Sequence, residues 1–113
     1  MHELSICEGI RAIIEEQARD AGFTRVARVS LEIGQFAGVE VEALRFGFDV
    51  AMRGSPAEHA ELEIIELPAT AWCLPCARTV AIAQRWDGCP NCGSHQLQRT
   101  GGEELRIKSL EVD

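Results

Sequence analysis

The chain has 113 residues, 46% of them hydrophobic, and a formal net charge of −7. Such an acidic chain is a poor general binder of nucleic acid, because affinity for phosphate comes from Lys and Arg side chains. No apolar run approaches the roughly 18 residues of a membrane span, and the first residues lack the basic start and apolar stretch of a signal peptide. We therefore expect a small cytoplasmic protein with a modest core.

The first predicted element is an amphipathic helix over residues 4–21. Its apolar side chains recur at intervals of three and four, and charged residues cover the other face. Ser5 and Glu8 match a capping box, which predicts that residues 1–4 form a short free arm outside the helix. A helix that starts near Glu3 would shorten that arm but leave it terminal.

Three strands and a second helix follow. Residues 25–33 alternate apolar and polar side chains, which is typical of a half-buried strand. After a turn at 34–38, residues 41–52 carry the second helical pattern. Residues 62–67 and 105–112 read as further strands in which the alternation slips, and this predicts a bulge or burial on both faces. Together these elements predict an α+β fold: two helices with a three-stranded mixed sheet.

Four cysteines occur as two closely spaced pairs. Their sequences are Cys73-Leu-Pro-Cys76 and Cys89-Pro-Asn-Cys92-Gly93. Two facing CxxC turns supply four thiolates at about 2.3 Å, the tetrahedral set typical of zinc. Because four protein ligands close the shell, the site is expected to be structural and not catalytic. Gly93 can take the positive φ that such a turn favours, whereas Ala77 stands at the matching place in the first pair.

The cysteine pairs lie between the second and third predicted strands, so we expect an inserted four-cysteine zinc-ribbon module. This gives a domain of residues 1–68 and 101–113 and a zinc-binding domain of residues 69–100. Within the module, residues 78–86 are predicted to be a strand. Trp72 and Trp86 flank the cysteines and are expected to pack over the zinc loops.

The N-terminus offers a second candidate metal site. His2 is too large for efficient removal of Met1, so the Met1 amine should remain free. That amine, the His2 amide nitrogen and the His2 imidazole can chelate one metal in a plane, which suits Ni²⁺ or Cu²⁺. An open fourth position would allow transfer of the metal. The alternative is that His2 is a polar residue on a frayed end.

The remaining candidates are single residues. Cys7 falls on the apolar stripe of the first helix and is expected to be a small buried core residue. His95 follows Cys92 by three residues and is either an exposed histidine or a further metal donor, while His59 is expected in a solvated loop. Nothing resembles a nucleophile–base pair or a phosphate loop, so no enzymatic activity is expected.

Three blocks of the sequence, in their order and separation, resemble the HypA/HybF family of nickel chaperones for [NiFe]-hydrogenase maturation. The blocks are Met1-His2-Glu3-Leu4-Ser5, the four-cysteine module ending Cys89-Pro-Asn-Cys92-Gly93, and Gly102-Glu103-Glu104-Leu105-Arg106-Ile107-Lys108-Ser109-Leu110-Glu111-Val112.

The resemblance runs over the whole chain and implies a nickel-binding domain that carries an inserted zinc domain. It implies Ni(II) bound by His2, with the Met1 amine and Glu3 beside it. It also implies Zn(II) bound by the four paired cysteines, Cys73, Cys76, Cys89 and Cys92. The implied partners are the nickel GTPase HypB and the hydrogenase large subunit, in some organisms also urease. From the charge and the lack of a long apolar run we expect no nucleic-acid partner and no membrane. We expect a monomer or a weak homodimer.

Two other classes of protein remain open from the residues alone. One is a zinc-ribbon nucleic-acid or transcription accessory protein, which the acidic charge disfavours. The other is a rubredoxin-like iron electron carrier, because four cysteines also hold iron.

Overall fold

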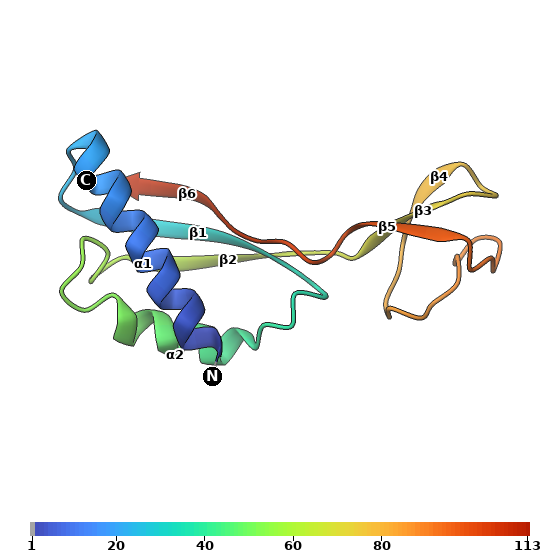
Figure 1. Ribbon diagram of the computed structural model, residues 1–113, viewed down its shortest axis with the longest axis horizontal. Coiled ribbons are helices and arrows are strands. Elements are labelled where there is room, and N and C mark those ends of the chain that lie inside the picture. The colour runs from blue at the N-terminus through green and yellow to red at the C-terminus, as the bar shows by residue number, and fades with distance from the viewer. Residues whose placement is uncertain (1) are drawn as a thin grey trace. The chain divides into compact units, whose positions relative to one another are not determined.

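The structure is a computed structural model that describes residues 2–113. The elements in chain order are α1 (His2–Ala21), β1 (Val26–Gly34), α2 (Val41–Ala51), β2 (Glu61–Leu67), β3 (Thr70–Cys73), β4 (Arg78–Ala81), β5 (Leu97–Gly101) and β6 (Leu105–Val112). The strands form two three-stranded sheets, ordered β2-β1-β6 and β4-β3-β5 (Figure 1). Neither helix among the described residues is long and apolar enough to cross a membrane.

The first sheet is mixed, as predicted. Hydrogen bonds at both ends of β1 show that β2 runs parallel to it and that β6 runs antiparallel. The bonds are Val26 N to Pro56 O, Gln35 N to Leu67 O, Gly34 N to Glu104 O and Asp113 N to Arg25 O. A parallel pair needs a crossover connection, and α2 supplies it between β1 and β2. The predicted α+β class with two helices and a mixed sheet is therefore confirmed.

Contacts divide the chain into two compact units. The first unit runs to Leu31 and also contains Val39–Ile64 and Ile107–Asp113, and the second unit consists of Glu32–Gly38 and Ile65–Arg106. The second unit therefore contains all four paired cysteines together with the turn after β1. The predicted division into a domain of residues 1–68 and 101–113 and a zinc-binding domain of residues 69–100 stays a prediction.

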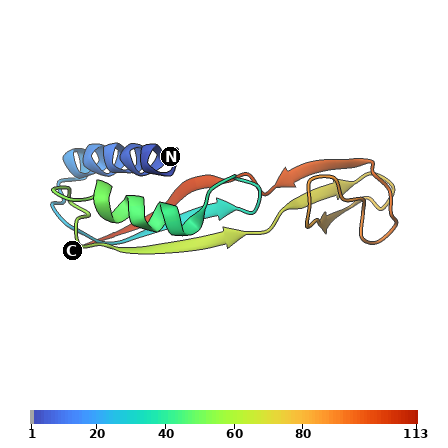
Figure 2. The ribbon, with the colours of Figure 1, turned by 90° about the horizontal axis from the view of Figure 1, so that it is seen from below.

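In the first unit, α1 and α2 lie on the same face of the sheet (Figure 2). The core residues on these elements are Cys7, Ile10 and Ile14 of α1, Leu44, Phe48 and Met52 at α2, and Val26, Val29 and Leu31 of β1. The helices pack closely at Gly47, where an added Cβ would lie 3.4 Å from Cys7 Sγ and 3.6 Å from Leu4 Cα. The apolar stripes predicted for both helices thus form the interface and the core.

The prediction of a free N-terminal arm is wrong for the described residues, because α1 begins at His2. The Glu3 carboxylate accepts a hydrogen bond from the Glu40 amide at 3.2 Å, and Leu4 lies against Gly47 of α2. These tertiary contacts hold the first turn helical, so Ser5 lies inside the helix and does not serve as its cap. The alternative prediction, a helix that begins near Glu3, is close to the observed start at His2.

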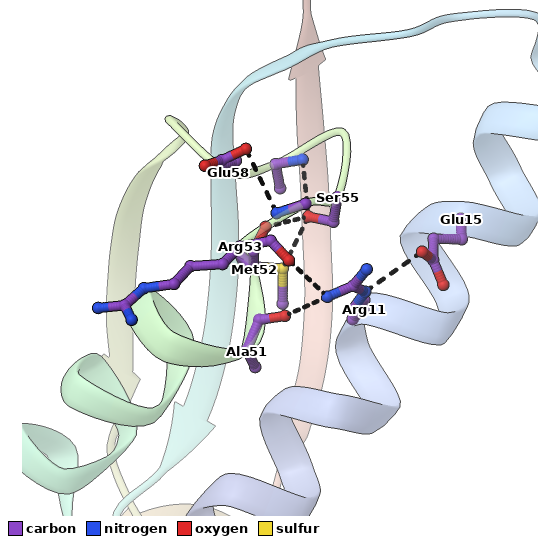
Figure 3. A network of polar contacts seen from close by, with 9 residues as sticks. Arg11, Glu15, Ala51, Met52, Arg53, Ser55 and Glu58 are labelled. Atoms are coloured by element: carbon purple, nitrogen blue, oxygen red, sulfur yellow. Dashed lines mark hydrogen bonds and ion pairs between the residues drawn. The ribbon is translucent and has the colours of Figure 1, made fainter.

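Arg11 joins the two helices at the C-terminal end of α2 (Figure 3). The last turn of α2 contains no basic residue of its own. Arg11 Nη1 donates to the carbonyl of Ala51 at 2.9 Å and to that of Arg53 at 2.8 Å, while its Nε pairs with Glu15 at 3.2 Å. The guanidinium therefore satisfies carbonyls that a helix end leaves without partners.

In the second unit, β4 ends at Ala81, which shortens the strand predicted for residues 78–86. The carboxylate of Asp87 accepts hydrogen bonds from the amides of Ala83 and Gln84 at 3.2 and 3.0 Å. A carboxylate that binds nearby amides competes with strand pairing, and the chain turns here. Trp72 is 38% and Trp86 73% exposed, and their expected packing over the metal loops stays a prediction.

The second unit has a small apolar core next to its sheet. Ala69, Ala71 and Ile82 are buried together, and Phe36 and Leu97 pack against them. Gly102 closes this region in a positive-φ conformation of 121°, where an added Cβ would lie 2.9 Å from Ala69 Cα. This cluster lies at the start of β3, and the first cysteine turn begins at the end of the same strand.

Candidate metal centre

Each cysteine pair sits in a tight turn of the same kind. Behind the first pair, the Ala77 amide donates to the Cys73 carbonyl at 2.8 Å; behind the second, the Gly93 amide donates to the Cys89 carbonyl at 2.8 Å. The turn requires a positive φ at its last residue, which is 52° at Ala77 and 78° at Gly93. The prediction for Gly93 is confirmed, and Ala77 adopts the same backbone despite its Cβ.

The four sulfur atoms come together from the two turns. Cys73 Sγ lies 3.6 Å from Cys92 Sγ, and Cys76 Sγ lies 4.0 Å from Cys89 Sγ. All four ligand atoms lie within 4.8 Å of one another. A tetrahedron with metal–sulfur bonds of about 2.3 Å has sulfur–sulfur edges of about 3.8 Å. The cluster therefore has the size and donor set of a tetrahedral four-thiolate site.

The four thiols have unlike surroundings. Cys73 and Cys89 are buried, Cys76 is half-buried and Cys92 is exposed. Burial raises the pKa of Cys73 to about 12. The backbone amides of Cys92 and Asn91 lower the pKa of Cys89 to about 6. Without a cation the cluster therefore favours an anion at Cys89 and a thiol at Cys73, and a bound divalent cation would supply the charge needed to ionise the rest.

Asn91 contacts both cysteine pairs. Its backbone amide lies 3.4 Å from Cys89 Sγ, and its side-chain Nδ2 lies 3.3 Å from Cys76 Sγ. Sequence reasoning missed this residue, because the CxxC pattern leaves the two middle positions free. The only signal was an amide side chain inside the second pair.

The histidines of the loops lie outside this cluster. Among the described residues the group that could hold a metal consists of the four cysteines alone. His95 is exposed, with its ring beside Gly88, where an added Cβ would lie 3.3 Å from His95 Nε2. His59 is exposed in the loop after α2, as predicted.

At the start of α1, His2 and Glu3 lie side by side. His2 Nε2 is 3.5 Å from Glu3 Oε2, and the His2 side chain is 59% exposed while that of Glu3 is 14% exposed. The hydrogen bond from the Glu40 amide, followed by that from its own amide, lowers the pKa of Glu3. Met1, the other predicted nickel ligand, lies outside the described residues.

Cys7 is a core residue, as predicted. It is fully buried, and its Sγ donates to the Leu44 carbonyl at 3.4 Å. Burial raises its pKa to about 11. A thiol that stays protonated and enclosed is a poor ligand, so Cys7 serves the packing between α1 and α2.

The fold and the cluster define a class: a small α+β protein with an additional four-cysteine metal-binding unit. The family model described as "Hydrogenase/urease nickel incorporation, metallochaperone, hypA" matches residues 1–112. The chain belongs to this HypA family, whose members are nickel metallochaperones of hydrogenase maturation and not enzymes.

Individual relatives agree with this assignment. The "Hydrogenase maturation factor HypA" of Acidithiobacillus ferrooxidans is 60% identical and that of Azotobacter vinelandii 59% identical, each over 100% of both chains. The solution structure of the Ni metallochaperone HypA from Helicobacter pylori is 25% identical, with a TM-score of 0.70 over 99% of this chain and 97% of that one.

Proposed function

We propose that this chain binds Ni(II) at its N-terminus and delivers it to the hydrogenase maturation pathway, while Zn(II) holds the four-cysteine unit together. The nickel ligands in this proposal are His2, the Met1 amine and Glu3. The zinc ligands are Cys73, Cys76, Cys89 and Cys92. The observation that carries the nickel proposal is the exposed imidazole of His2 beside a carboxylate, in a chain of this family.

The helical start of α1 supports ligation by the backbone. The first four amides of a helix have no acceptor within the helix, so the His2 amide nitrogen is not engaged by an intrahelical bond. This nitrogen must lose its proton to bind nickel, and the resulting negative charge lies at the helix end that favours anions. The positive end of the helix dipole therefore stabilises the deprotonated amide nitrogen, whereas it disfavours a cation that lacks such a ligand.

The ionised carboxylate of Glu3 adds a further negative charge. Its position is held by the Glu40 amide from the segment before α2, at 3.2 Å. One carboxylate oxygen already accepts this bond, so Glu3 would bind nickel through its remaining lone pairs. Alternatively, it would influence the metal indirectly, through its contact with the His2 imidazole. Glu40 thus has a positioning role through its backbone, and not through its side chain, in this proposal.

Nickel titration by calorimetry tests the site. Untagged protein should bind nickel, and His2→Ala should lose that binding while its circular dichroism spectrum stays unchanged. His59→Ala is the matched control, because His59 is another exposed histidine of the first unit. An N-terminal extension should also abolish binding. Equal nickel affinity in the extended and untagged proteins would rule out the amine as a ligand.

The proposed recipients follow from the family resemblance. They are the nickel GTPase HypB and the hydrogenase large subunit, with urease as a further client where it occurs. In a strain that lacks its own chaperone, wild-type protein should restore nickel-dependent hydrogenase activity and His2→Ala should not. Restoration by excess nickel alone would show that the defect is in delivery. Restoration by the His2→Ala variant at ordinary nickel levels would contradict the proposal.

A further inference from the structure

Asn91 lies between the two cysteines of the second pair and contacts a sulfur of each pair. Its backbone amide donates to Cys89 of its own pair, and its side-chain amide donates to Cys76 of the other pair, at 3.4 and 3.3 Å. Among the hydrogen bonds between side chains in the described residues, this is the contact that joins an amide to a sulfur of the opposite turn. Two sulfur–sulfur contacts, Cys73–Cys92 at 3.6 Å and Cys76–Cys89 at 4.0 Å, also join the two turns.

We propose that the Asn91 side chain is a positioning residue that fixes the two cysteine turns at metal-binding distance and protects the Cys76 sulfur. The proposal rests on the proposed zinc site. A thiolate accepts hydrogen bonds from amides, and an amide that donates to a metal-binding sulfur orients that sulfur and reduces its charge. Removal of such partners costs about 10–100-fold in metal affinity in other proteins.

The four sulfur ligands differ in their exposure to solvent, and this decides which of them the Asn91 side chain can protect. Cys73 and Cys89 are buried, whereas Cys76 is half-buried and Cys92 is exposed. The metal shell is therefore accessible from the side of the second cysteine of each pair. On that side Cys76 carries the Asn91 bond, so Cys92 is the ligand that solvent and reagents reach first.

The surroundings of Asn91 allow its side chain to be changed without disturbing the core. Asn91 is exposed, and it lines a surface hollow of about 390 Å³ with Arg78, Thr79, Val80, Ala81 and Pro90. Thr79 lines the same hollow, and no hydrogen bond joins its side chain to a sulfur among the described residues. Thr79→Ala is therefore a matched control.

The experiment uses the full chain loaded with zinc, in wild type, Asn91→Ala, Asn91→Asp and Thr79→Ala. Zinc affinity is measured by competition with a chromophoric chelator, and alkylation of each cysteine is followed by mass spectrometry. We expect Asn91→Ala to bind zinc about tenfold more weakly. Asn91→Asp should be weaker still, because an anionic oxygen would face the Cys76 thiolate at nearly the same place. Thr79→Ala should match wild type.

The alkylation pattern separates a positioning role from a general loss of stability. In wild type Cys92 should react first. In Asn91→Ala the rate at Cys76 should rise several-fold, while Cys89 keeps its backbone donor and its slow rate. An equal rise of the alkylation rate at all four cysteines would overturn the positioning role of Asn91. Wild-type zinc affinity in Asn91→Asp would overturn it as well. Wild-type protein that holds no zinc would instead refute the proposed zinc site.

Discussion

At the scale of single residues, the two cysteine turns differ at one informative place. Ala77 and Gly93 occupy equivalent positive-φ positions, with φ of 52° and 78°. For a residue with a Cβ this conformation costs roughly 1–2 kcal/mol, because the Cβ crowds the following carbonyl. The first turn therefore carries backbone strain that the second avoids.

Exchange of these two residue types should change the stability of the second unit in opposite directions. Gly93→Ala should destabilise the unit by about 1 kcal/mol. Space is not the cause, since no atom lies within 4 Å of the added Cβ. Ala77→Gly should stabilise it by up to about 1 kcal/mol, less the added freedom of the unfolded chain. Chemical unfolding of the second unit in the zinc-loaded protein measures the change in unfolding free energy for both variants.

Gly9→Ala provides the control for the glycine effect. Gly9 lies inside α1, also with no atom within 4 Å of an added Cβ. There the same substitution should stabilise by about 0.5–1 kcal/mol, because a helix interior disfavours glycine. A loss of stability at Gly9 equal to that at Gly93 would contradict the assignment of strain to the positive φ.

At the scale of elements, Arg11 supplies the positive charge that the last turn of α2 lacks. Its Nη1 donates to two carbonyls at the end of α2, at 2.9 and 2.8 Å. Arg11→Ala should lower the free energy of unfolding of the first unit by roughly 1–2 kcal/mol, the value for charged hydrogen bonds reduced for partial exposure. Thermal unfolding followed by circular dichroism measures this loss.

Two further variants test the mechanism at Arg11. Arg11→Lys should recover only part of the stability, because lysine lacks the separate Nε–H that pairs with Glu15 while Nη1 binds the two carbonyls. Arg19→Ala, on an exposed residue near the end of the same helix, should change stability by less than about 0.5 kcal/mol. Equal losses for Arg11→Ala and Arg19→Ala would show that the carbonyl contacts contribute nothing.

The elements also show which patterns in the sequence were sufficient. The period-two alternation of β1 and the cysteine spacing predicted the strand and the sulfur cluster, because both are local patterns with one dominant explanation. The start of α1 was not predictable, since the Ser5–Glu8 capping box competes with a docking of Glu3 onto Glu40 that is distant in sequence. The early end of β4 depends on Asp87, and the bridge at Asn91 depends on two turns that meet only in the fold.

At the scale of the whole molecule, the two units should respond differently to loss of metal. The second unit has a small apolar core, and a structural zinc site supplies folding free energy directly. Chelation, Cys73→Ala or Cys92→Ala should collapse the amide signals of residues 69–100 in NMR spectra. Signals of α1 and α2 should persist, because their core contains none of the four ligands. Simultaneous loss of both sets of signals would contradict this prediction.

Acidification should remove nickel before zinc. The imidazole and the amine bind nickel only without their protons, so acid competes with the metal for both nitrogens. Nickel affinity should therefore fall as the pH drops from about 7.5 to 6. The pKa of Glu3 is lowered in the fold, so this carboxylate stays ionised across that range and its contribution is lost only at lower pH.

Nickel and zinc can be followed separately by calorimetry and by X-ray absorption at the zinc edge. The four thiolates, held together by the fold and by the cation, should keep their zinc spectrum over the same pH range. Variant His59→Ala should show the wild-type nickel profile. Nickel binding that remains constant between these pH values would refute the imidazole–amine site.

The order of the strands has a consequence for synthesis on the ribosome. β1 is the central strand of β2-β1-β6, yet β6 is the last element of the chain. At about 5–20 residues per second, the segment between β2 and β6 takes roughly 2–7 seconds to make. During that interval β1 has one open edge, a template for pairing with other chains. The cysteine turns are complete before this edge closes, so zinc capture is able to precede the final strand addition in the nascent protein.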